Sequence, residues 1–355
     1  MPALEIAHEL AGVREEWQAL GERSGNVFAT WDWADAWWRH FGEGEPFLAL
    51  ARGEDGEPAA LVALELRKRG PLRVARFVGH GPSDELGPIS AAGDPRGAEA
   101  LLELHNGSER RWDVLLAERL PPGAGAEKLG GRTLLREGSP VVEAPEGGFD
   151  GFLASRSRNF RSQVGRKERK LLERGLTYRL GDDPERLEAD MRTLGELHEA
   201  RWGAEGSGAL RDRRAAFHLD FARAALERGW LRLWLAEVDG KAVAAWYGFR
   251  FGGAEWYYQS GRDPDWDKDS VGLVLLAHTI REAFDDGLRT YRLLRGGESY
   301  KDRFATSDPG LETVVAGRGA LGAAAERLSG AALRLRRALR RESGGAPSTT
   351  PRPSG

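Results

Sequence analysis

A polar loop that runs into an apolar stretch is the part of this sequence best suited to bind an anion. The loop ends at Lys268-Asp269-Ser270-Val271-Gly272, and the apolar residues Leu273–Leu276 follow directly. If a helix begins here, its first-turn amides lack partners within the helix, and its dipole attracts negative charge. Gly272 would let a ligand approach the backbone, and the Ser270 hydroxyl would cap the helix. The pattern predicts a pyrophosphate site on the amides of Ser270, Val271, Gly272 and Leu273, with an ordinary capped helix as the alternative.

A second candidate site follows a helix that we predict from Pro184 to about Trp202. Apolar residues recur at helical spacing along this stretch, and a glycine-rich loop follows at 203–208. Because such loops often border substrate pockets, His198 and Trp202 are candidate substrate contacts. His198 could act as a base, although a single histidine on an apolar stripe more often packs in the core.

The strongest charge run, from Ser155 to Arg174, predicts an amphipathic helix with a basic outer face. Its apolar residues form one stripe at Phe160, Val164, Leu171 and Leu172. The basic face could receive phosphates or another polyanion, or it could simply be solvated. No aromatic residues interleave for base stacking, so we do not expect nucleic acid as a partner.

The composition fits a soluble globular protein of about two domains. The chain has 355 residues, 41% of them hydrophobic and 30% charged, with a net charge of −3 and no cysteine. The lack of cysteine excludes disulfides, thiolate nucleophiles and cysteine-based zinc sites, and we expect no metal site. No apolar run approaches the roughly 20 residues of a membrane helix, and the N-terminus lacks a signal-peptide pattern. We therefore expect a cytoplasmic protein without a transmembrane segment.

The order of predicted elements repeats, which indicates two related halves. Strands at 46–52 and 60–66 flank an Asp-Gly turn, and a third strand follows near 74–78. Strands at 230–236 and 242–249 flank a second Asp-Gly turn, and a third follows near 255–259. A segment rich in Gly, Pro and Glu at 121–148 joins the halves. We predict domains at 1–145 and 150–317.

The remaining residues, 318–355, are predicted to form a basic helix and a disordered tail. The helix alternates Leu and Ala with Arg around 333–341. It could contact an anionic membrane or RNA, and a solvated helix is the simpler alternative.

The order of motifs from about residue 150 to 315 resembles the acetyltransferase domain of the GNAT superfamily, in its Fem-like branch. That branch includes acyltransferases associated with cellulose and exopolysaccharide biosynthesis. The matching segments are Ser157–Arg161, His198–Trp202, Leu235–Ala244, Tyr257–Gly261, Ser270–Leu276 and Arg295–Phe304. The first half is similar to the family's degenerate companion domain at Phe28–Trp33, Trp37-Trp38 and Ser83–Gly87.

The resemblance implies a mixed α/β fold of two GNAT-like halves, each a mixed β-sheet flanked by helices. It also implies transfer of an acyl group, such as acetyl, from acyl-CoA as co-substrate to an amine or hydroxyl of a small-molecule, saccharide or peptide-like acceptor. The usual pyrophosphate loop of the superfamily is Gln/Arg-x-x-Gly-x-Gly/Ala. This sequence departs from it, because only Gly272 is present.

Direct attack within a ternary complex is the economical mechanism under this interpretation, because the chain has no cysteine and no Gly-x-Ser-x-Gly motif. The strand through Gln259 and Ser260 would hold the pantetheine arm. Glu298 is a candidate base, and Tyr300 could donate a proton to the departing sulfur. Lys301 could bind an acidic substrate or a phosphate. Alternatively, Glu298 and Lys301 form a surface ion pair and Tyr300 packs into the sheet.

Asp84 could face a cleft between the halves and contact substrate, or it could cap its own Gly/Pro/Ser loop. Two other functions stay open. A Fem-type transferase would use aminoacyl-tRNA, but no long helical-hairpin insertion occurs between Asp150 and Gly317. A non-catalytic relative would bind a polyanion or carbohydrate, which the reduced glycine loop favours and the segment Glu298-Ser299-Tyr300-Lys301 opposes. Clustered tryptophans are compatible with a sugar-like ligand or with a core.

Overall fold

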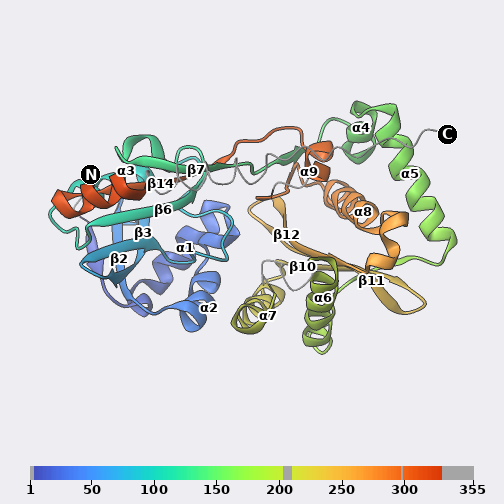
Figure 1. Cartoon of the computed structure of the whole chain (residues 1–355), viewed down its shortest axis with the longest axis horizontal. Helices are drawn as coiled ribbons and strands as arrows, with labels where there is room; N and C mark the ends of the chain where they lie inside the picture. Colours follow the sequence, from blue (N-terminus) through green and yellow to red (C-terminus); the bar gives the residue numbers. More distant parts are fainter. Residues whose placement is uncertain (1–3, 203–209, 297–298, 330–355) are drawn as a thin grey trace, which may run out of the picture.

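The protein folds into two lobes that lie side by side, each built on one mixed β-sheet (Figure 1). The computed structural model describes residues 4–202, 210–296 and 299–329. The predicted basic helix at 333–341 and the tail at 343–355 lie outside these residues. The predicted fold class, a mixed α/β fold of two halves with helices flanking each sheet, is confirmed.

The first lobe contains a sheet whose strands follow the order β1-β2-β3-β4-β6-β14-β7, with the short β5 paired to β3. Helices α1 and α2 lie below this sheet in Figure 1, and α3 lies near its upper edge. The elements up to the second lobe are β1 (Glu5–Ala7), η1 (Leu10–Val13), α1 (Arg14–Ser24), η2 (Val27–Ala29), α2 (Trp31–Phe41), β2 (Glu45–Arg52), β3 (Pro58–Arg69), β4 (Leu72–Phe77), β5 (Ile89–Ser90), α3 (Arg96–Asn106), β6 (Val114–Leu120), η3 (Ala126–Lys128), β7 (Arg132–Glu137) and β8 (Val141–Glu143).

The second lobe contains a sheet in the order β8-β13-β12-β11-β10-β9. Helices α6 and α7 lie on one side of it, and α4, α5 and α8 lie on the other (Figure 1). After β8 the chain continues through α4 (Gly148–Ser155), α5 (Arg158–Glu173), β9 (Thr177–Leu180), α6 (Leu187–Trp202), α7 (Asp212–Glu227), β10 (Leu231–Val238), β11 (Lys241–Phe251), β12 (Ala254–Arg262), η4 (Pro264–Asp269), α8 (Val271–Asp285), β13 (Thr290–Arg292) and α9 (Ser299–Phe304) of the second lobe, and then β14 (Leu311–Gly317) of the first sheet.

The two lobes repeat one order of elements. The antiparallel ribbons β2-β3-β4 and β10-β11-β12 are each followed by a helix, α3 or α8, and then by a strand parallel to the third. That parallel pairing joins β4 to β6 and β12 to β13. The hairpin turn of the second lobe has positive φ at both Asp239 and Gly240, which the right-handed twist of the strands favours. The duplication inferred from the two Asp-Gly turns is therefore present in the fold.

The lobes exchange one strand each at the sequence boundary. β8 precedes the second lobe in the chain but pairs with β13 of the second sheet. β14, at the end of the predicted domain 150–317, returns to the first sheet and pairs with β6 and β7. Each sheet is therefore completed by a strand that lies, in sequence, beyond the other elements of its lobe.

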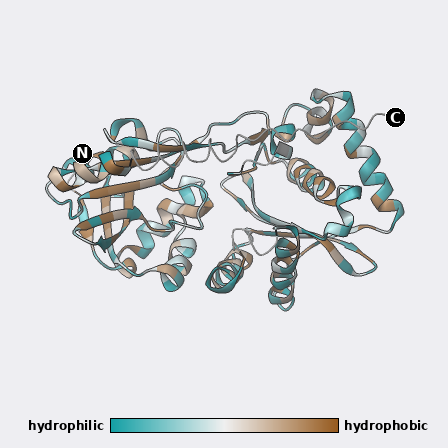
Figure 2. Ribbon diagram, in the orientation of Figure 1, coloured by the Kyte–Doolittle hydropathy of each residue, from teal (hydrophilic) through white to brown (hydrophobic). Residues whose placement is uncertain are grey.

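Alternating side chains give each central strand two buried faces. In β2, Leu48 and Leu50 point to the core beneath α1 and α2, whereas Phe47, Ala49 and Ala51 point to the core beneath α3. Figure 2 shows the strands of both sheets mostly hydrophobic and the outer helix α5 mostly hydrophilic.

One apolar cluster joins the two lobes. It includes Trp33 of α2, Phe217 of α7 and Trp256 of β12, each fully buried. Most of the tryptophan clusters seen in the sequence therefore form core rather than a ligand platform.

Burial of His218 on α7 predicts a pH dependence of stability. The side chain is fully buried, and burial lowers its pKa from 6.5 to about 3. Between these values the unfolded chain binds a proton that the folded chain does not, so stability falls as the pH drops from 6.5 towards 3. We expect His218→Phe to reduce the slope of unfolding free energy by about 1 kcal/mol per pH unit near pH 5.5.

Urea unfolding at several pH values measures this slope. The control variant is His8→Phe, which replaces an exposed histidine. Equal slopes in all three proteins would mean that His218 titrates normally in the folded chain.

Candidate active site

The second sheet opens between β12 and β13. The two strands pair only where Ala254–Trp256 meet Thr290–Arg292, and β12 then continues to Arg262. Beyond Trp256 the edge of β12 opposite β11 has no strand partner among the described residues. Such an edge can form backbone hydrogen bonds to an extended ligand.

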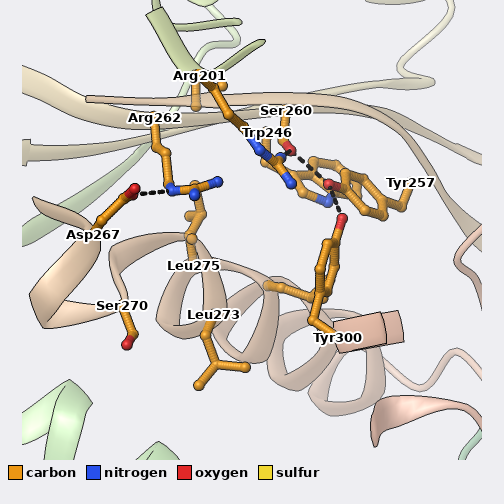
Figure 3. Close-up of a pocket in the computed structure, with 14 residues that line it drawn as sticks. Arg201, Trp246, Tyr257, Ser260, Arg262, Asp267, Ser270, Leu273, Leu275 and Tyr300 are labelled. Atoms are coloured by element: carbon orange, nitrogen blue, oxygen red, sulfur yellow. Dashed lines mark hydrogen bonds and ion pairs between the residues drawn. The ribbon is translucent and has the colours of Figure 1, made fainter. Parts of the chain in front are cut away.

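A cavity of about 370 Å³ lies between this part of β12 and the start of α8, and we call it the donor cavity (Figure 3). Its wall combines apolar side chains of α8 with polar side chains from β12, α6 and α9. The lining residues are Arg201, Ala245, Trp246, Tyr257, Ser260, Gly261, Arg262, Asp267, Ser270, Gly272, Leu273, Leu275, Leu276 and Tyr300.

The start of α8 leaves two backbone amides without acceptors. Ser270 has a left-handed backbone with φ of 62°, and its carbonyl accepts from the amides of Leu273 and Val274. Its own amide donates to the Asp267 carbonyl. In the part of the chain that the structure describes, only the Val271 and Gly272 amides of this turn lack an acceptor.

Three details of the sequence prediction are therefore wrong. The Ser270 hydroxyl does not cap α8, because the left-handed backbone turns this residue out of the usual N-cap geometry and no amide reaches the side chain. The amides of Ser270 and Leu273 already donate within the protein. The predicted set of four phosphate-binding amides reduces to Val271 and Gly272.

Gly272 keeps its own amide accessible from the donor cavity. It is half-buried and lines the cavity, whereas the Val271 side chain is fully buried beneath α8. A Cβ atom on Gly272 would meet only the Cδ atom of Arg262, at 3.4 Å. Arg262 itself is held by Asp267 at the rim (Figure 3). A longer side chain at position 272 would thus project into the cavity without displacing the backbone.

A chain of hydrogen bonds crosses the inner end of the donor cavity (Figure 3). The Tyr257 hydroxyl lies 2.9 Å from the Tyr300 hydroxyl and 2.5 Å from Ser260 Oγ. Arg201 Nη1 donates to the same Ser260 oxygen at 2.8 Å. Burial acts to lower the pKa of Arg201, but the hydroxyls of Tyr257 and Tyr300 raise it above its ordinary value. Arg201 therefore stays a cation beside two phenols.

A second cavity of about 250 Å³ adjoins this network, and we call it the acceptor cavity. Arg201, Tyr257 and Ser260 line both cavities. Nearly all of its other lining side chains are polar, and two carboxylates come from the first lobe. The full lining is Asp84, Glu137, Arg201, Trp202, Tyr257, Tyr258, Gln259, Ser260, Arg295, Gly296 and Lys301.

Asp84 crosses from the first lobe to meet Arg295 of the second. Its Oδ1 atom accepts from Arg295 Nε at 2.6 Å, and Arg295 Nη1 lies 3.3 Å from Glu137 Oε1. Burial raises the pKa of Asp84, and the Arg295 charge opposes that rise. Lys301 is 4% exposed, donates to the Arg295 carbonyl at 2.8 Å, and packs over the Tyr257 ring.

The loop that carries Asp84 is held on several sides. Trp33 Nε1 donates to Ser83 Oγ at 2.8 Å, and Arg119 donates to the carbonyls of Gly81 and Ser83. The Tyr258 hydroxyl of β12 donates to the Pro82 carbonyl at 2.8 Å. These bonds fix Asp84 at the cavity wall, so the interpretation as a simple turn cap does not describe its surroundings.

The structure brings most predicted site residues to one of the two cavities. Ser260, Ser270, Gly272, Leu273 and Tyr300 line the donor cavity, and Asp84, Trp202, Gln259, Ser260 and Lys301 line the acceptor cavity. His198 lines neither, because it is buried, and this burial lowers its pKa. Glu298 lies outside the described residues.

Sequence reasoning missed several polar residues of the site, among them Arg201, Tyr257, Arg295 and Glu137. Arg201, Tyr257 and Arg295 stand inside segments that matched the family pattern, but their roles depend on partners distant in sequence. Glu137 lies in a joint between the halves and gave no local signal.

The described residues contain no group of three or more His, Asp or Glu side chains placed to hold a metal ion. In the same residues, every helix is too short or too polar to span a lipid bilayer.

Comparison with known proteins identifies the part of the second lobe that resembles a known domain. Residues 158–302 match the sequence model of the acetyltransferase (GNAT) domain. The matched region contains the donor cavity and all lining residues of the acceptor cavity except Asp84 and Glu137. No curated protein sequence matches the chain.

Solved structures share the two-lobed fold at low sequence identity. The crystal structure of FemX is 14% identical, with a TM-score of 0.63 over 88% of this chain and 97% of that chain. The C-terminal domain of a protein named as a lysylphosphatidylglycerol synthetase from Agrobacterium fabrum is 12% identical, with a TM-score of 0.60 over 90% and 95% of the two chains. L-PGS from Bacillus licheniformis is 13% identical, with a TM-score of 0.56 over 90% and 95%. Residues 158–302 thus match the model of a GNAT acetyltransferase domain, and FemX shares the fold over both lobes.

Proposed function

We propose that this protein transfers an acyl group from a pantetheine thioester such as acetyl-CoA to an amine or hydroxyl acceptor. The match to an acetyltransferase domain supports acyl transfer as the class of reaction. The observation that carries the proposal is the junction of two cavities at Arg201, Tyr257 and Ser260. One cavity borders the helix start that carries the unbonded Val271 and Gly272 amides and is lined by Gly272, and the other presents carboxylates and cations.

The donor cavity suits a phosphopantetheine arm. The Val271 and Gly272 amides would bind a phosphate, aided by the helix dipole. The unpaired edge of β12 would hold the arm by backbone hydrogen bonds, as a strand does, and would direct the thioester to the polar network near Tyr257. Holding both substrates in this way supplies several kcal/mol toward the barrier, because the attack becomes intramolecular.

The acceptor cavity suits a hydrophilic nucleophile. Asp84 and Glu137 could hold an ammonium or hydroxyl, and the raised pKa of Asp84 suits a group that takes a proton from the acceptor. Glu298, which lies close to Arg295 in the sequence, stays the second candidate base from the sequence analysis. Trp202 is 43% exposed and lines the acceptor cavity. A small-molecule or saccharide acceptor would pack against its apolar ring face.

Tyr300, which lines the donor cavity, would protonate the leaving group. As the acceptor attacks the thioester carbonyl, the C–S bond breaks and the sulfur leaves as a thiolate. The Tyr300 hydroxyl would donate its proton to that sulfur, while Arg201 stabilises the negative charge left on the phenol pair. The chain has no cysteine to carry an acyl-enzyme, so a ternary complex is the simplest route.

Calorimetric titration with acetyl-CoA, combined with a thiol-release assay on a panel of amines and amino sugars, tests this function. We expect saturable binding and acceptor-dependent thiol release, with intersecting initial-velocity lines. An absence of both heat and thiol release, together with turnover of aminoacyl-tRNA, would instead support the Fem-type alternative. Against that alternative, the described helices between residues 148 and 304 have at most 16 residues and contain no long hairpin.

We expect Asp84→Asn to raise the KM for the acceptor by about tenfold and to leave the affinity for acetyl-CoA unchanged, because a good hydrogen bond to a charged group contributes about 1.5 kcal/mol. Asparagine keeps an oxygen for Arg295, so the contact between the lobes survives. Glu118, which pairs with Arg76 away from both cavities, gives the control variant Glu118→Gln. A change in acetyl-CoA affinity as large as the change in acceptor KM would place Asp84 outside acceptor binding.

A further inference from the structure

Helix α5 presents a basic face beside the donor cavity. Its apolar residues Phe160, Val164 and Leu171 are buried against the second lobe. Its outer surface carries Arg158, Arg161, Arg166, Lys167, Arg169, Lys170 and, at its end, Arg174. The 16 residues of α5 extend this surface over about 24 Å. Figure 2 shows the helix as the hydrophilic outer edge of the lobe.

Ionic contacts fix this face to the loop that starts α8. Lys170 Nζ lies 2.7 Å from Asp269 Oδ1, and Arg174 pairs with the other oxygen of the same carboxylate. Lys167 donates to the Lys268 carbonyl. The basic face therefore stands next to the helix start that borders the donor cavity.

Part of the positive charge is not used inside the protein. Among the described residues, Arg158, Arg166 and Arg169 have no hydrogen-bonding or ionic partner. Isolated cations on a surface are easily solvated, but several on one helix face make an electrostatic surface for an acidic partner.

The start of α8 limits how many phosphate groups the donor can present there. Two amides, those of Val271 and Gly272, are unbonded, and the amides on either side donate within the protein. Two donors suit one phosphate group better than a pyrophosphate. The donor cavity of about 370 Å³ has room for a phosphopantetheine arm.

We propose, on the basis of the proposed function, that the physiological donor is an acyl group on the phosphopantetheine arm of an acidic carrier protein, which docks on the basic face of α5. The arm carries a single phosphodiester, and this group binds the Val271 and Gly272 amides. The carrier's acidic surface lies against Arg166 and Arg169. Free acyl-CoA shares the arm and binds the same cavity without using α5.

The reaction on this donor balances as it does for acyl-CoA. The acceptor nitrogen or oxygen bonds to the thioester carbon, and the carbon–sulfur bond breaks. The acceptor proton passes to the protein or solvent, and the sulfur takes a proton from Tyr300. The products are the acylated acceptor and the carrier with its free thiol, and no oxidant or reductant takes part.

Binding of an acidic acyl carrier protein loaded with an acetyl group tests this proposal. Affinities of the acetylated carrier, the apo carrier without its arm, and acetyl-CoA are measured for the wild type and for the variant Arg166→Glu/Arg169→Glu. We expect the variant to bind the acetylated carrier at least about tenfold more weakly at low salt and acetyl-CoA within about twofold of the wild type. The control Lys68→Glu/Arg69→Glu reverses the same charge on exposed residues of the first lobe and should behave as the wild type.

Several outcomes overturn the proposal. The acetylated carrier could bind no better than acetyl-pantetheine, or both charge-reversal variants could lose affinity equally. Loss of binding to bulk tRNA or to phosphatidylglycerol vesicles in the α5 variant, without carrier binding by the wild type, would assign the face to nucleic acid or lipid. If neither the carrier nor acetyl-CoA binds the wild type, the proposed function itself fails.

Discussion

Gly272→Glu is expected to weaken acetyl-CoA binding by at least about 100-fold, or about 2.7 kcal/mol, because it places a carboxylate where the donor phosphate must lie. The Cβ atom at this position meets only the flexible Arg262 side chain, so the substitution requires no backbone movement. A glutamate in the first turn also interacts favourably with the helix dipole. We therefore expect the unfolding free energy to change by less than about 1 kcal/mol.

Calorimetric titration measures the acetyl-CoA affinity, and urea unfolding of the same preparations measures the unfolding free energy. Gly272→Ala is the matched control, because it removes the glycine without adding a charge and should bind acetyl-CoA within about fivefold of the wild type. Retained affinity in Gly272→Glu would show that the phosphate binds elsewhere. Equal losses in both variants would point to the backbone rather than to charge.

Tyr300→Phe should lower kcat by about 100-fold and leave the Kd for acetyl-CoA within about twofold, the lower range for loss of a general acid. The ring would still pack beside Arg201, and only the hydroxyl next to Tyr257 would be lost. A poor leaving group depends on protonation more than a good one does. The defect should therefore shrink with a donor whose thiol has a low pKa, such as an aryl thioester.

The Tyr178 hydroxyl supplies the matched control. It is buried on β9, which β11 and β10 separate from β12, and it has no hydrogen-bond partner among the described residues, so Tyr178→Phe should leave kcat unchanged. Single-turnover kinetics with both variants separates chemistry from product release. A Tyr300→Phe rate equal to the wild type with both donors would remove this residue from the reaction.

The repeated fold was predictable because its signals are local. Alternating apolar residues and an Asp-Gly turn specify each hairpin, and the order strand, helix, strand recurs in both halves. Strand exchange was not predictable, because the short segments Val141–Glu143 and Leu311–Gly317 carry no local signal for the sheet that they join. Which sheet a strand joins depends on edges formed far away in sequence, such as the edge of β13 or β6.

The candidate site was predictable in position but not in detail. The helix start at Gly272 and the polar segment with Tyr300 were identified from residue types and spacing. The left-handed backbone of Ser270 was not, because a serine before a helix usually caps it. That single conformation turns the Ser270 carbonyl towards two amides of the first turn.

The residues of the acceptor cavity were the hardest to predict, because the fold brings them together from distant parts of the sequence. Asp84 and Arg295 lie 211 residues apart in the chain and meet only because the lobes share a core. His198 had the helical spacing of a core residue, and burial decided its role.

A crystal structure of the protein soaked with CoA tests the central claim most directly. We expect a phosphate of the bound coenzyme within hydrogen-bonding distance of both the Val271 and the Gly272 amide, with the thiol near Tyr300. Coenzyme bound with its phosphates away from this turn, or those two amides occupied by protein groups while the coenzyme lies elsewhere, would contradict it.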